Sequence, residues 1–277
     1  MSKSPKDSFR VSALRRWLAA VAVSAVTQPA AAVEMPPLQI YLLMGQSNMV
    51  GRDTSDMLGQ AEDPRIVTLD SAGSWVVARD PIHAKTSDKE PGVGPGISFA
   101  REMLVVSPAL KIGLVPTAVG GTELRRWVKG GDLYEHAVAR ARVAAQTSVI
   151  RGVLWHQGES DAKTHADASN YGERLTQMFK DLRQDLGQPD LPIIVGEIGD
   201  FLSPARFPAA DTVAEALRRM PEALPRVGFA DSAGLAHIGD HLHFTSASAR
   251  ELGRRYAHAM LELQASQTGS GRALQRH

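Results

Sequence analysis

Short apolar runs alternate along the chain with longer segments whose apolar positions recur every three or four residues. The short runs are typical of strands buried in a parallel sheet, and the longer segments are typical of amphipathic helices. The expected strands lie at about 38–44, 65–69, 75–77, 111–119, 151–155, 191–197 and 226–230. The expected helices lie at about 97–106, 133–147, 168–186, 208–220 and 246–263.

This alternation predicts an α/β fold, a three-layer α/β/α sandwich with a central parallel sheet. A closed barrel of eight strand–helix units is the alternative, but the pattern contains only five or six good units. Residues 80–96, which include three prolines and several charges, form the longest segment without a periodic pattern. We expect a surface loop there, because loops of this length tend to be functional or mobile.

The first 32 residues have the pattern of a removable export signal. Basic residues precede an apolar stretch of about ten residues, Trp17–Val26, and Ala30–Ala32 provides a small-residue cleavage site. Crossing a bilayer takes about 20 apolar residues, so this stretch predicts export without membrane insertion. Arg15 and Arg16 leave both the general secretion route and the twin-arginine route open. We therefore expect a periplasmic or secreted protein.

About 245 residues remain once a signal peptide at 1–32 is removed. That length is enough for one α/β domain with a substantial core, which we expect at 33–265. A flexible tail is expected at 266–277, where glycine, serine, glutamine and arginine prevail.

The composition excludes several classes of function. The chain of 277 residues carries 31 basic and 30 acidic residues, a formal net charge of +1. It therefore has no overall field that would attract nucleic acid or an anionic membrane. Cysteine is absent, so disulfides and thiolate chemistry are not available. We expect no cofactor, and no partner protein is evident from the sequence.

Polar clusters follow several of the apolar runs. Because the carboxyl ends of parallel strands meet at one edge of a sheet, we expect these clusters to lie close together, where ligands bind. The four clusters are Gln46–Asn48, Gly120–Thr122, His156–Asp161 and Gly239–His243. Considered alone, the first cluster has two interpretations. It is either a turn with a helix N-cap or the site of a nucleophilic serine, Ser47.

A serine nucleophile needs a base, usually a histidine that a carboxylate orients. Asp240 and His243 can supply both, because the Asp-x-x-His spacing lets the aspartate reach back to the imidazole. His241 is equally close to Asp240 in sequence, so spacing leaves both histidines open. Polar capping before a helix is a further interpretation of this segment.

Hydrogen-bond donors for a developing oxyanion are expected at Gly120 and Gln157, a backbone N–H and a side-chain amide. Gly120 and Gly121 are also compatible with a tight turn. His156 and Glu159 could instead join the late histidines as metal ligands. We expect no metal, because no cysteine-based spacing occurs and the late histidines are expected in a loop.

Four segments, in this order, resemble the motifs of SGNH-type carbohydrate acetylesterases. They are Gly45–Met49, Gly120–Thr122, Trp155–Asp161 and Asp240–Phe244. The chain is most similar to the sialate O-acetylesterase and acetylxylan esterase group, family 6 of the carbohydrate esterases, over about residues 38–260. The resemblance implies a flavodoxin-like α/β/α fold and a serine esterase that removes acetyl groups from sugar hydroxyls.

Carried over by position, the resemblance makes Ser47 the nucleophile, His243 the general base and Asp240 the carboxylate behind it. The oxyanion hole would combine the N–H groups of Ser47 and Gly120 with the amide of Gln157, where broader SGNH enzymes have an asparagine. A carboxylate of the 156–161 loop could replace Asp240.

Four further residues are candidates for contact with the substrate, an acetylated carbohydrate. Gly94 lies in a glycine-rich segment that also resembles a family motif, and Glu159 either lines the pocket or holds its loop. Arg125 would favour an acidic sugar such as a sialic acid, and Trp127 could stack on a pyranose. A helix start with surface arginines and a half-buried tryptophan is the alternative for Arg125 and Trp127.

Two other functions remain alternatives to a carbohydrate acetylesterase. One is a lipase or thioesterase, and the other is an inactive sugar-binding module on the same fold.

Overall fold

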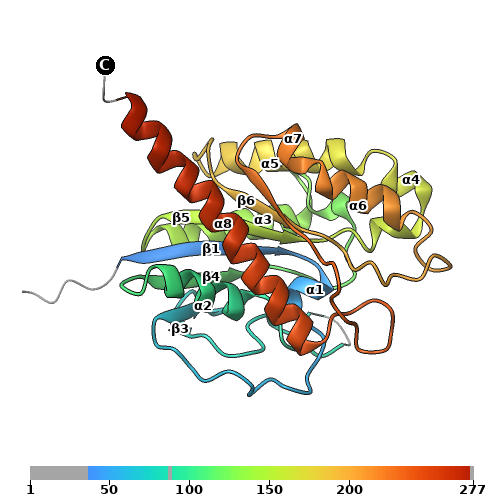
Figure 1. The fold of residues 1–277 in the computed structure, drawn as a ribbon, viewed down its shortest axis with the longest axis horizontal. Helices are drawn as coiled ribbons and strands as arrows, with labels where there is room; N and C mark the ends of the chain where they lie inside the picture. The colour runs from blue at the N-terminus through green and yellow to red at the C-terminus, as the bar shows by residue number, and fades with distance from the viewer. Residues whose placement is uncertain (1–36, 87–88, 275–277) are drawn as a thin grey trace, which may run out of the picture. The chain divides into compact units, whose positions relative to one another are not determined.

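The structure is a computed structural model, and it describes residues 37–86 and 89–274. The expected signal peptide at 1–32 lies outside the described residues. In the described part, one sheet lies between two layers of helices (Figure 1). The expected three-layer α/β/α sandwich is therefore confirmed. No helix of the described ranges has the length and apolar character needed to cross a membrane.

Seven strands of the described chain form one sheet in the order β3-β2-β4-β1-β5-β6-β7. Neighbours are parallel, except that the edge strand β3 is antiparallel to β2. After β1 the chain builds one side of the sheet and then returns to build the other. This reversal places the carboxyl end of β1 at the topological switch point, where α/β sheets bind ligands. The strands are Leu38–Gly45 (β1), Ile66–Leu69 (β2), Trp75–Val77 (β3), Lys111–Pro116 (β4), Ile150–His156 (β5), Ile193–Gly196 (β6) and Val227–Ala230 (β7).

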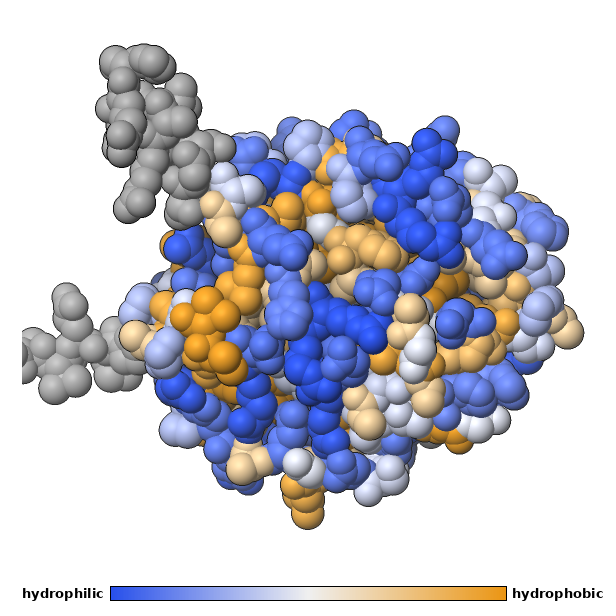
Figure 2. Space-filling view, viewed as in Figure 1, coloured by the Kyte–Doolittle hydropathy of each residue, from blue (hydrophilic) through white to orange (hydrophobic). Residues whose placement is uncertain are grey.

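Helices α3, α5 and α6 cover one face of the sheet, and α2 and α8 cover the other. Short turns of helix connect several of these elements. Hydrophilic residues follow the outer side of α8 (Figure 2). The helices are Ser47–Val50 (α1), Gly96–Val106 (α2), Asp132–Ala145 (α3), His165–Ala168 (α4), Tyr171–Asp185 (α5), Ala210–Arg218 (α6), Met220–Ala223 (α7) and Ser246–Leu274 (α8), with 3₁₀ turns at Leu124–Arg126 (η1) and Asp161–Lys163 (η2).

From Ile40 onward the central strand β1 is apolar, because both of its faces are covered there. Ile40, Leu42 and Met44 pack into the core beneath α3, α5 and α6. Tyr41 and Leu43 point the other way, into the core beneath α2 and α8. Successive side chains of a strand alternate between faces, so a strand buried on both sides has no polar positions.

Most expected boundaries lie within about three residues of those in the structure, but two expectations differ by more. The last helix does not end near Leu263 but continues to Leu274. No proline interrupts the added residues, and the low helix propensities of their glycines, serines and threonine do not end the helix. The described residues of the 80–96 segment contain no helix before Gly96 and no strand, as expected, but they do not all lie at the surface. His83 and residues 91–96 are buried. The flexibility of the tail stays a prediction.

Candidate active site

Ser47 lies at the carboxyl end of β1, on a sharp turn between the strand and α1. The turn needs Gly45, whose φ is +128° and whose Cβ, if it had one, would lie 2.0 Å from the carbonyl oxygen of His156. The N–H of Gln46 donates to that same carbonyl. Ser47 then begins α1, and Gly51 donates to its carbonyl. This geometry presents the serine side chain to the pocket beyond the sheet.

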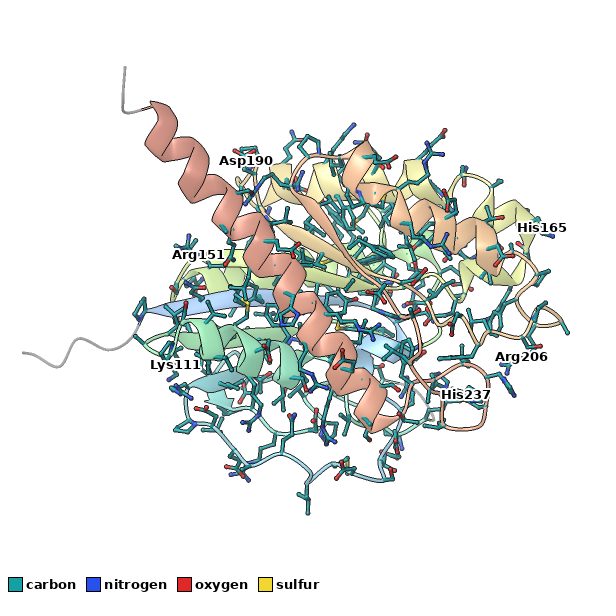
Figure 3. The ribbon with its side chains drawn as sticks, viewed as in Figure 1. Lys111, Arg151, His165, Asp190, Arg206 and His237 are labelled. Carbon is teal, nitrogen blue, oxygen red and sulfur yellow. The ribbon has the colours of Figure 1, made fainter. Side chains whose placement is uncertain are left out.

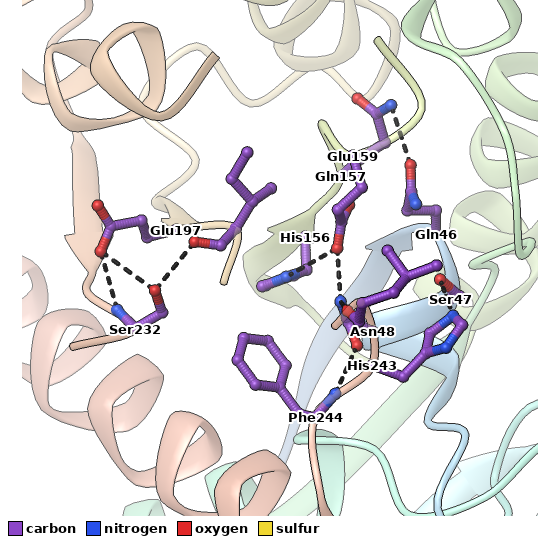
Figure 4. Close-up of polar contacts among 12 residues, drawn as sticks. Gln46, Ser47, Asn48, His156, Gln157, Glu159, Glu197, Ser232, His243 and Phe244 are labelled. Carbon is purple, nitrogen blue, oxygen red and sulfur yellow. Dashed lines mark hydrogen bonds and ion pairs between the residues drawn. The ribbon is translucent and has the colours of Figure 1, made fainter. Parts of the chain in front are cut away.

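A continuous hydrogen-bonded chain joins Ser47, His243 and Asp240. The distance from Ser47 Oγ to His243 Nε2 is 3.1 Å, and the distance from His243 Nδ1 to Asp240 Oδ2 is 2.6 Å. The other Asp240 oxygen accepts the backbone N–H groups of Leu242 and His243. Of the two candidate histidines, His243 is the one that lies beside Ser47 (Figure 4).

His241 points elsewhere. Its φ of +52° is unusual for a residue with a side chain, and its ring lies 4.2 Å, centroid to centroid, from the ring of His237. Figure 3 shows His237 and Arg206 beyond one end of the sheet, opposite the end marked by Lys111 and Arg151. His241 therefore belongs to the outer surface of the loop that carries His243.

Burial lowers the pKa of His243 below the ordinary value of 6.5, although the hydrogen bond and charge of Asp240 oppose the shift. For Asp240, burial raises the pKa, but hydrogen bonds from His243 and Leu242 outweigh it, so the net pKa is lowered. The pair is therefore a neutral imidazole whose Nδ1–H donates to a carboxylate. This protonation state leaves Nε2 free to accept the proton of Ser47.

Gly120 lies beside Ser47 on the β4 side of β1. A Cβ at Gly120 would lie 2.0 Å from Arg52 Nη2 and 3.6 Å from Ser47 Cβ. The turn interpretation also holds, because Gly121 has φ +73°. Within the described part of the chain, neither the Ser47 N–H nor the Gly120 N–H has a hydrogen-bond acceptor. Both donors therefore remain available to a ligand.

Gln157 does not reach the pocket, which corrects the expectation that its amide is an oxyanion donor. The side chain is fully buried. Its Nε2 lies within hydrogen-bond distance of Gln46 Oε1, the Thr122 carbonyl and Asp161 Oδ2, at 3.2, 3.0 and 2.6 Å. Its Oε1 accepts from Tyr171 Oη. The amide is thus fully engaged inside the protein.

Glu159 holds the segment that carries His243. Its Oε1 accepts a hydrogen bond from Asn48 Nδ2 at 2.5 Å, and Asn48 also donates to the Leu242 carbonyl and accepts from the Phe244 N–H (Figure 4). Burial raises the pKa of Glu159, but the neighbouring His156 ring and the hydrogen bond from the Asn48 amide outweigh it, so its pKa is lowered. Glu159 also lines the pocket wall.

The carboxylates of the 156–161 loop do not replace Asp240. Glu159 Oε1 lies 3.6 Å from His156 Nε2, and Asp161 accepts hydrogen bonds from Gln157 and the Leu124 N–H. Neither carboxylate is hydrogen-bonded to His243. The described residues also contain no cluster of three or more histidine, aspartate or glutamate side chains suited to a metal.

Three residues expected to contact the substrate do not line the pocket over Ser47. Trp127 has no exposed surface, because its indole packs edge-on against Trp155 and donates to Thr122 Oγ1. Arg125 is exposed and paired with Glu123, away from the pocket lining. Gly94 packs on the backbone of residues 49–50, where a Cβ would lie 2.6 Å from a carbonyl oxygen.

The pocket over Ser47 has a volume of about 380 Å³ and a cationic lining that the sequence analysis missed. Arg52 lies shortly after the turn that carries Ser47. This position is the one sequence signal that could have indicated a cationic pocket lining. The other cationic residues come from three separate loops. Besides Ser47, Gly120 and His243, the pocket is lined by Gln46, Arg52, Lys89, Gly121, Glu159, Ser160, Lys163, Arg206, Phe207 and Leu242.

Comparison with known proteins supports these observations. Residues 37–262 match the model of a family described as carbohydrate esterases, sialic acid-specific acetylesterases. The chain belongs to this family. It is accordingly a carboxylic ester hydrolase, of a family that acts on acetyl esters of carbohydrates.

Individual relatives agree with the family assignment. The "Probable carbohydrate esterase At4g34215" of Arabidopsis thaliana is 35% identical over 248 residues, which are 82% of this chain and 92% of the relative. Its X-ray structure superposes with a TM-score of 0.73, covering 82% of this chain and 99% of that one. The crystal structure of NanS, 20% identical, has a TM-score of 0.69 over 85% of this chain and all of that one. At this identity, the likeness to NanS shows a shared fold.

Proposed function

We propose that this carbohydrate esterase works through a serine acyl-enzyme, with Ser47 as nucleophile, His243 as general base and Asp240 as the orienting carboxylate. The observation that supports this mechanism is the hydrogen-bonded chain from Ser47 Oγ through both ring nitrogens of His243 to Asp240. A buried, neutral imidazole at this place is what activation of a serine hydroxyl requires.

In the first half of the reaction, Ser47 Oγ bonds to the acetyl carbon and its proton passes to His243 Nε2. The carbonyl oxygen becomes negative and accepts hydrogen bonds from the N–H groups of Ser47 and Gly120. The ester C–O bond then breaks, and the sugar alcohol leaves with the proton from His243. In the second half, water gives a proton to His243 and attacks the acetyl group, and acetate leaves as Ser47 is restored.

The pocket lining favours an acidic acetylated sugar over a neutral one. Arg52, Lys163 and Arg206 line the cavity, whereas Glu159 is the only acid among its described lining residues and is engaged with Asn48. A cleft lined by one sign of charge concentrates ligands of the opposite sign. We therefore propose O-acetylated sialic acids as the preferred substrates, with acetylated xylo-oligosaccharides as the alternative.

Replacing the nucleophile tests the mechanism. Ser47→Ala should abolish release of 4-nitrophenol from its acetate ester while the thermal midpoint stays near that of the wild type. Retained hydrolysis would refute the assignment of Ser47. Binding of an acetylated sugar by the wild type without any release of acetate would favour a binding module instead.

Acetate release from O-acetylated sialic acids and from acetylated xylo-oligosaccharides tests the substrate. We expect a higher kcat/KM for the acidic sugar. Lys163→Gln should reduce that preference without changing hydrolysis of 4-nitrophenyl acetate, because its charge lies on the pocket wall. Lys180→Gln, an exposed lysine outside this pocket, is the matched control. Equal or higher kcat/KM for the neutral sugar would reverse the substrate assignment.

A further inference from the structure

Gln46, the residue before Ser47, lines the pocket with its side-chain amide held in one orientation. Its Oε1 accepts hydrogen bonds from the Ser160 backbone N–H at 3.3 Å and from Gln157 Nε2 at 3.2 Å. A backbone N–H can only donate, so the amide oxygen must face the 157–160 loop. The nitrogen then lies on the opposite side of the amide from this loop, and Figure 4 shows the oxygen turned toward Gln157.

Buried groups enforce this orientation. Asp161 Oδ2 accepts from both the Leu124 N–H and Gln157 Nε2, at 2.8 and 2.6 Å. A carboxylate acceptor fixes Gln157 with its nitrogen toward Gln46. The single proton of Tyr171 Oη is shared between the Gln157 backbone carbonyl at 2.8 Å and the Gln157 side-chain oxygen at 3.0 Å. The side chains of Asp161, Gln157 and Tyr171 are almost fully buried. The direction of the Gln46 amide is thus preorganised before any ligand arrives.

The nitrogen of Gln46 has no acceptor of its own. None of the described residues accepts a hydrogen bond from Gln46 Nε2, and this nitrogen is not among the buried polar atoms left without a partner. Because Gln46 lines the same cavity as Ser47, Gly120 and His243, the available space for its N–H groups is the pocket. An amide donor without an acceptor in a reaction pocket is suited to a ligand oxygen.

We infer that Gln46 Nε2 is the third donor to the ester oxygen that becomes negative, the role expected of Gln157. This inference rests on the proposed function. Two of the three donors, Gln46 and Ser47, follow β1, and Gly120 follows the neighbouring strand β4. The loop after β5, on the other side of β1, holds the Gln46 amide. The oxyanion forms on the carbon bonded to Ser47 Oγ. A donor fixed in advance stabilises it without reorganisation.

Gln46→Met tests the inference, because methionine has similar length but no donor. We expect kcat to fall about 10²- to 10³-fold, the usual effect of losing one oxyanion donor, with little change in KM. The loss should be equal for 4-nitrophenyl acetate and for an acetylated sugar. Inhibition by methylboronic acid, which forms a tetrahedral adduct with a nucleophilic serine, should weaken in parallel.

Gln46→Glu separates the donor from the oxygen that anchors it. The carboxylate keeps an oxygen for Ser160 and Gln157 but has no N–H, so this variant should lose activity as well. Gln60→Met, the same replacement at a glutamine that is hydrogen-bonded to Ser98 outside the pocket, should behave as the wild type.

Wild-type activity in either Gln46 variant would overturn the inference, as would a loss confined to the sugar substrate. An inactive wild type would refute the proposed function itself, whereas an active wild type with an unaffected Gln46→Met refutes only Gln46.

Discussion

The carboxylate of Asp240 lies 2.6 Å from Nδ1 of His243 and also accepts the backbone N–H of that same residue at 2.9 Å. One side chain therefore closes the turn that carries the histidine and fixes its ring. With Nδ1–H donated to the carboxylate, Nε2 is the nitrogen that would accept a proton from Ser47 in the proposed mechanism.

Asp240→Asn should preserve the turn but disturb the ring. The amide oxygen can still accept the backbone N–H groups, yet the amide nitrogen would face Nδ1 and favour the tautomer with the proton on Nε2. We expect kcat to fall by about 10³- to 10⁴-fold with a smaller change in KM. Steady-state kinetics with 4-nitrophenyl acetate measures both, and unchanged kcat would show that Asp240 does not orient the base.

Replacing the two histidines one at a time distinguishes them. His243→Ala should abolish activity, because no other described imidazole is hydrogen-bonded to Ser47. His241→Ala should retain activity within a few-fold, since His241 faces His237. His241→Gly should also leave the free energy of unfolding unchanged or slightly higher, because glycine adopts a φ of +52° without strain. Loss of activity in His241→Ala alone would move the base to His241.

The pH dependence of kcat/KM should report His243. The base works when neutral, so activity is full above its pKa and is lost as pH falls through it. Because burial holds this pKa below 6.5, activity should persist below pH 6.5. Asp240 opposes the shift, so Asp240→Ala should move the acid limb to still lower pH as it lowers the rate. An acid limb centred above 6.5 would contradict the environment described here.

The apolar pattern was sufficient to predict the sheet. The inner parts of strands buried on both faces are apolar, so β1, β4 and β5 were evident as short apolar runs that lead into glycine or polar clusters. The candidate site followed because parallel strands bring those ends together. The choice between His241 and His243 did not follow, since it depends on a left-handed backbone at His241 that spacing does not encode.

Side-chain direction after a strand could not be predicted either. Gln157 precedes Gly158, whose φ of +150° turns the loop, and the amide points into the protein rather than the pocket. Trp127 follows a 3₁₀ turn that buries its indole. Arg52 reaches Gly120 only because the fold places the two loops together. Each of these contacts depends on tertiary structure that a local pattern does not contain.

The two glycines after β4 should respond differently to alanine. Gly120→Ala places a Cβ 2.0 Å from Arg52 Nη2, so the guanidinium or the Gly120 N–H must move. We expect kcat/KM to fall at least about 10²-fold, comparable with the loss of an oxyanion donor. Gly121→Ala has open space around the Cβ but φ +73°, so it should lower stability by about 1 kcal/mol and spare activity. Equal activity of the two variants would argue against a donor at Gly120.

Asn48 joins Glu159 to the segment that carries His243, so its loss should affect stability and activity together. Asn48→Ala leaves the Glu159 carboxylate, the Leu242 carbonyl and the Phe244 N–H without this partner. Each buried group left unpaired costs about 1–3 kcal/mol, and urea unfolding should show a loss in that range or above. The kcat should fall as well, because residues 242–244 are then free to move His243 away from Ser47.

Asn170→Ala is the matched control, since Asn170 is exposed and makes no capping hydrogen bond. A less stable Asn48→Ala with wild-type kcat would mean that Asp240 alone is sufficient to hold the histidine.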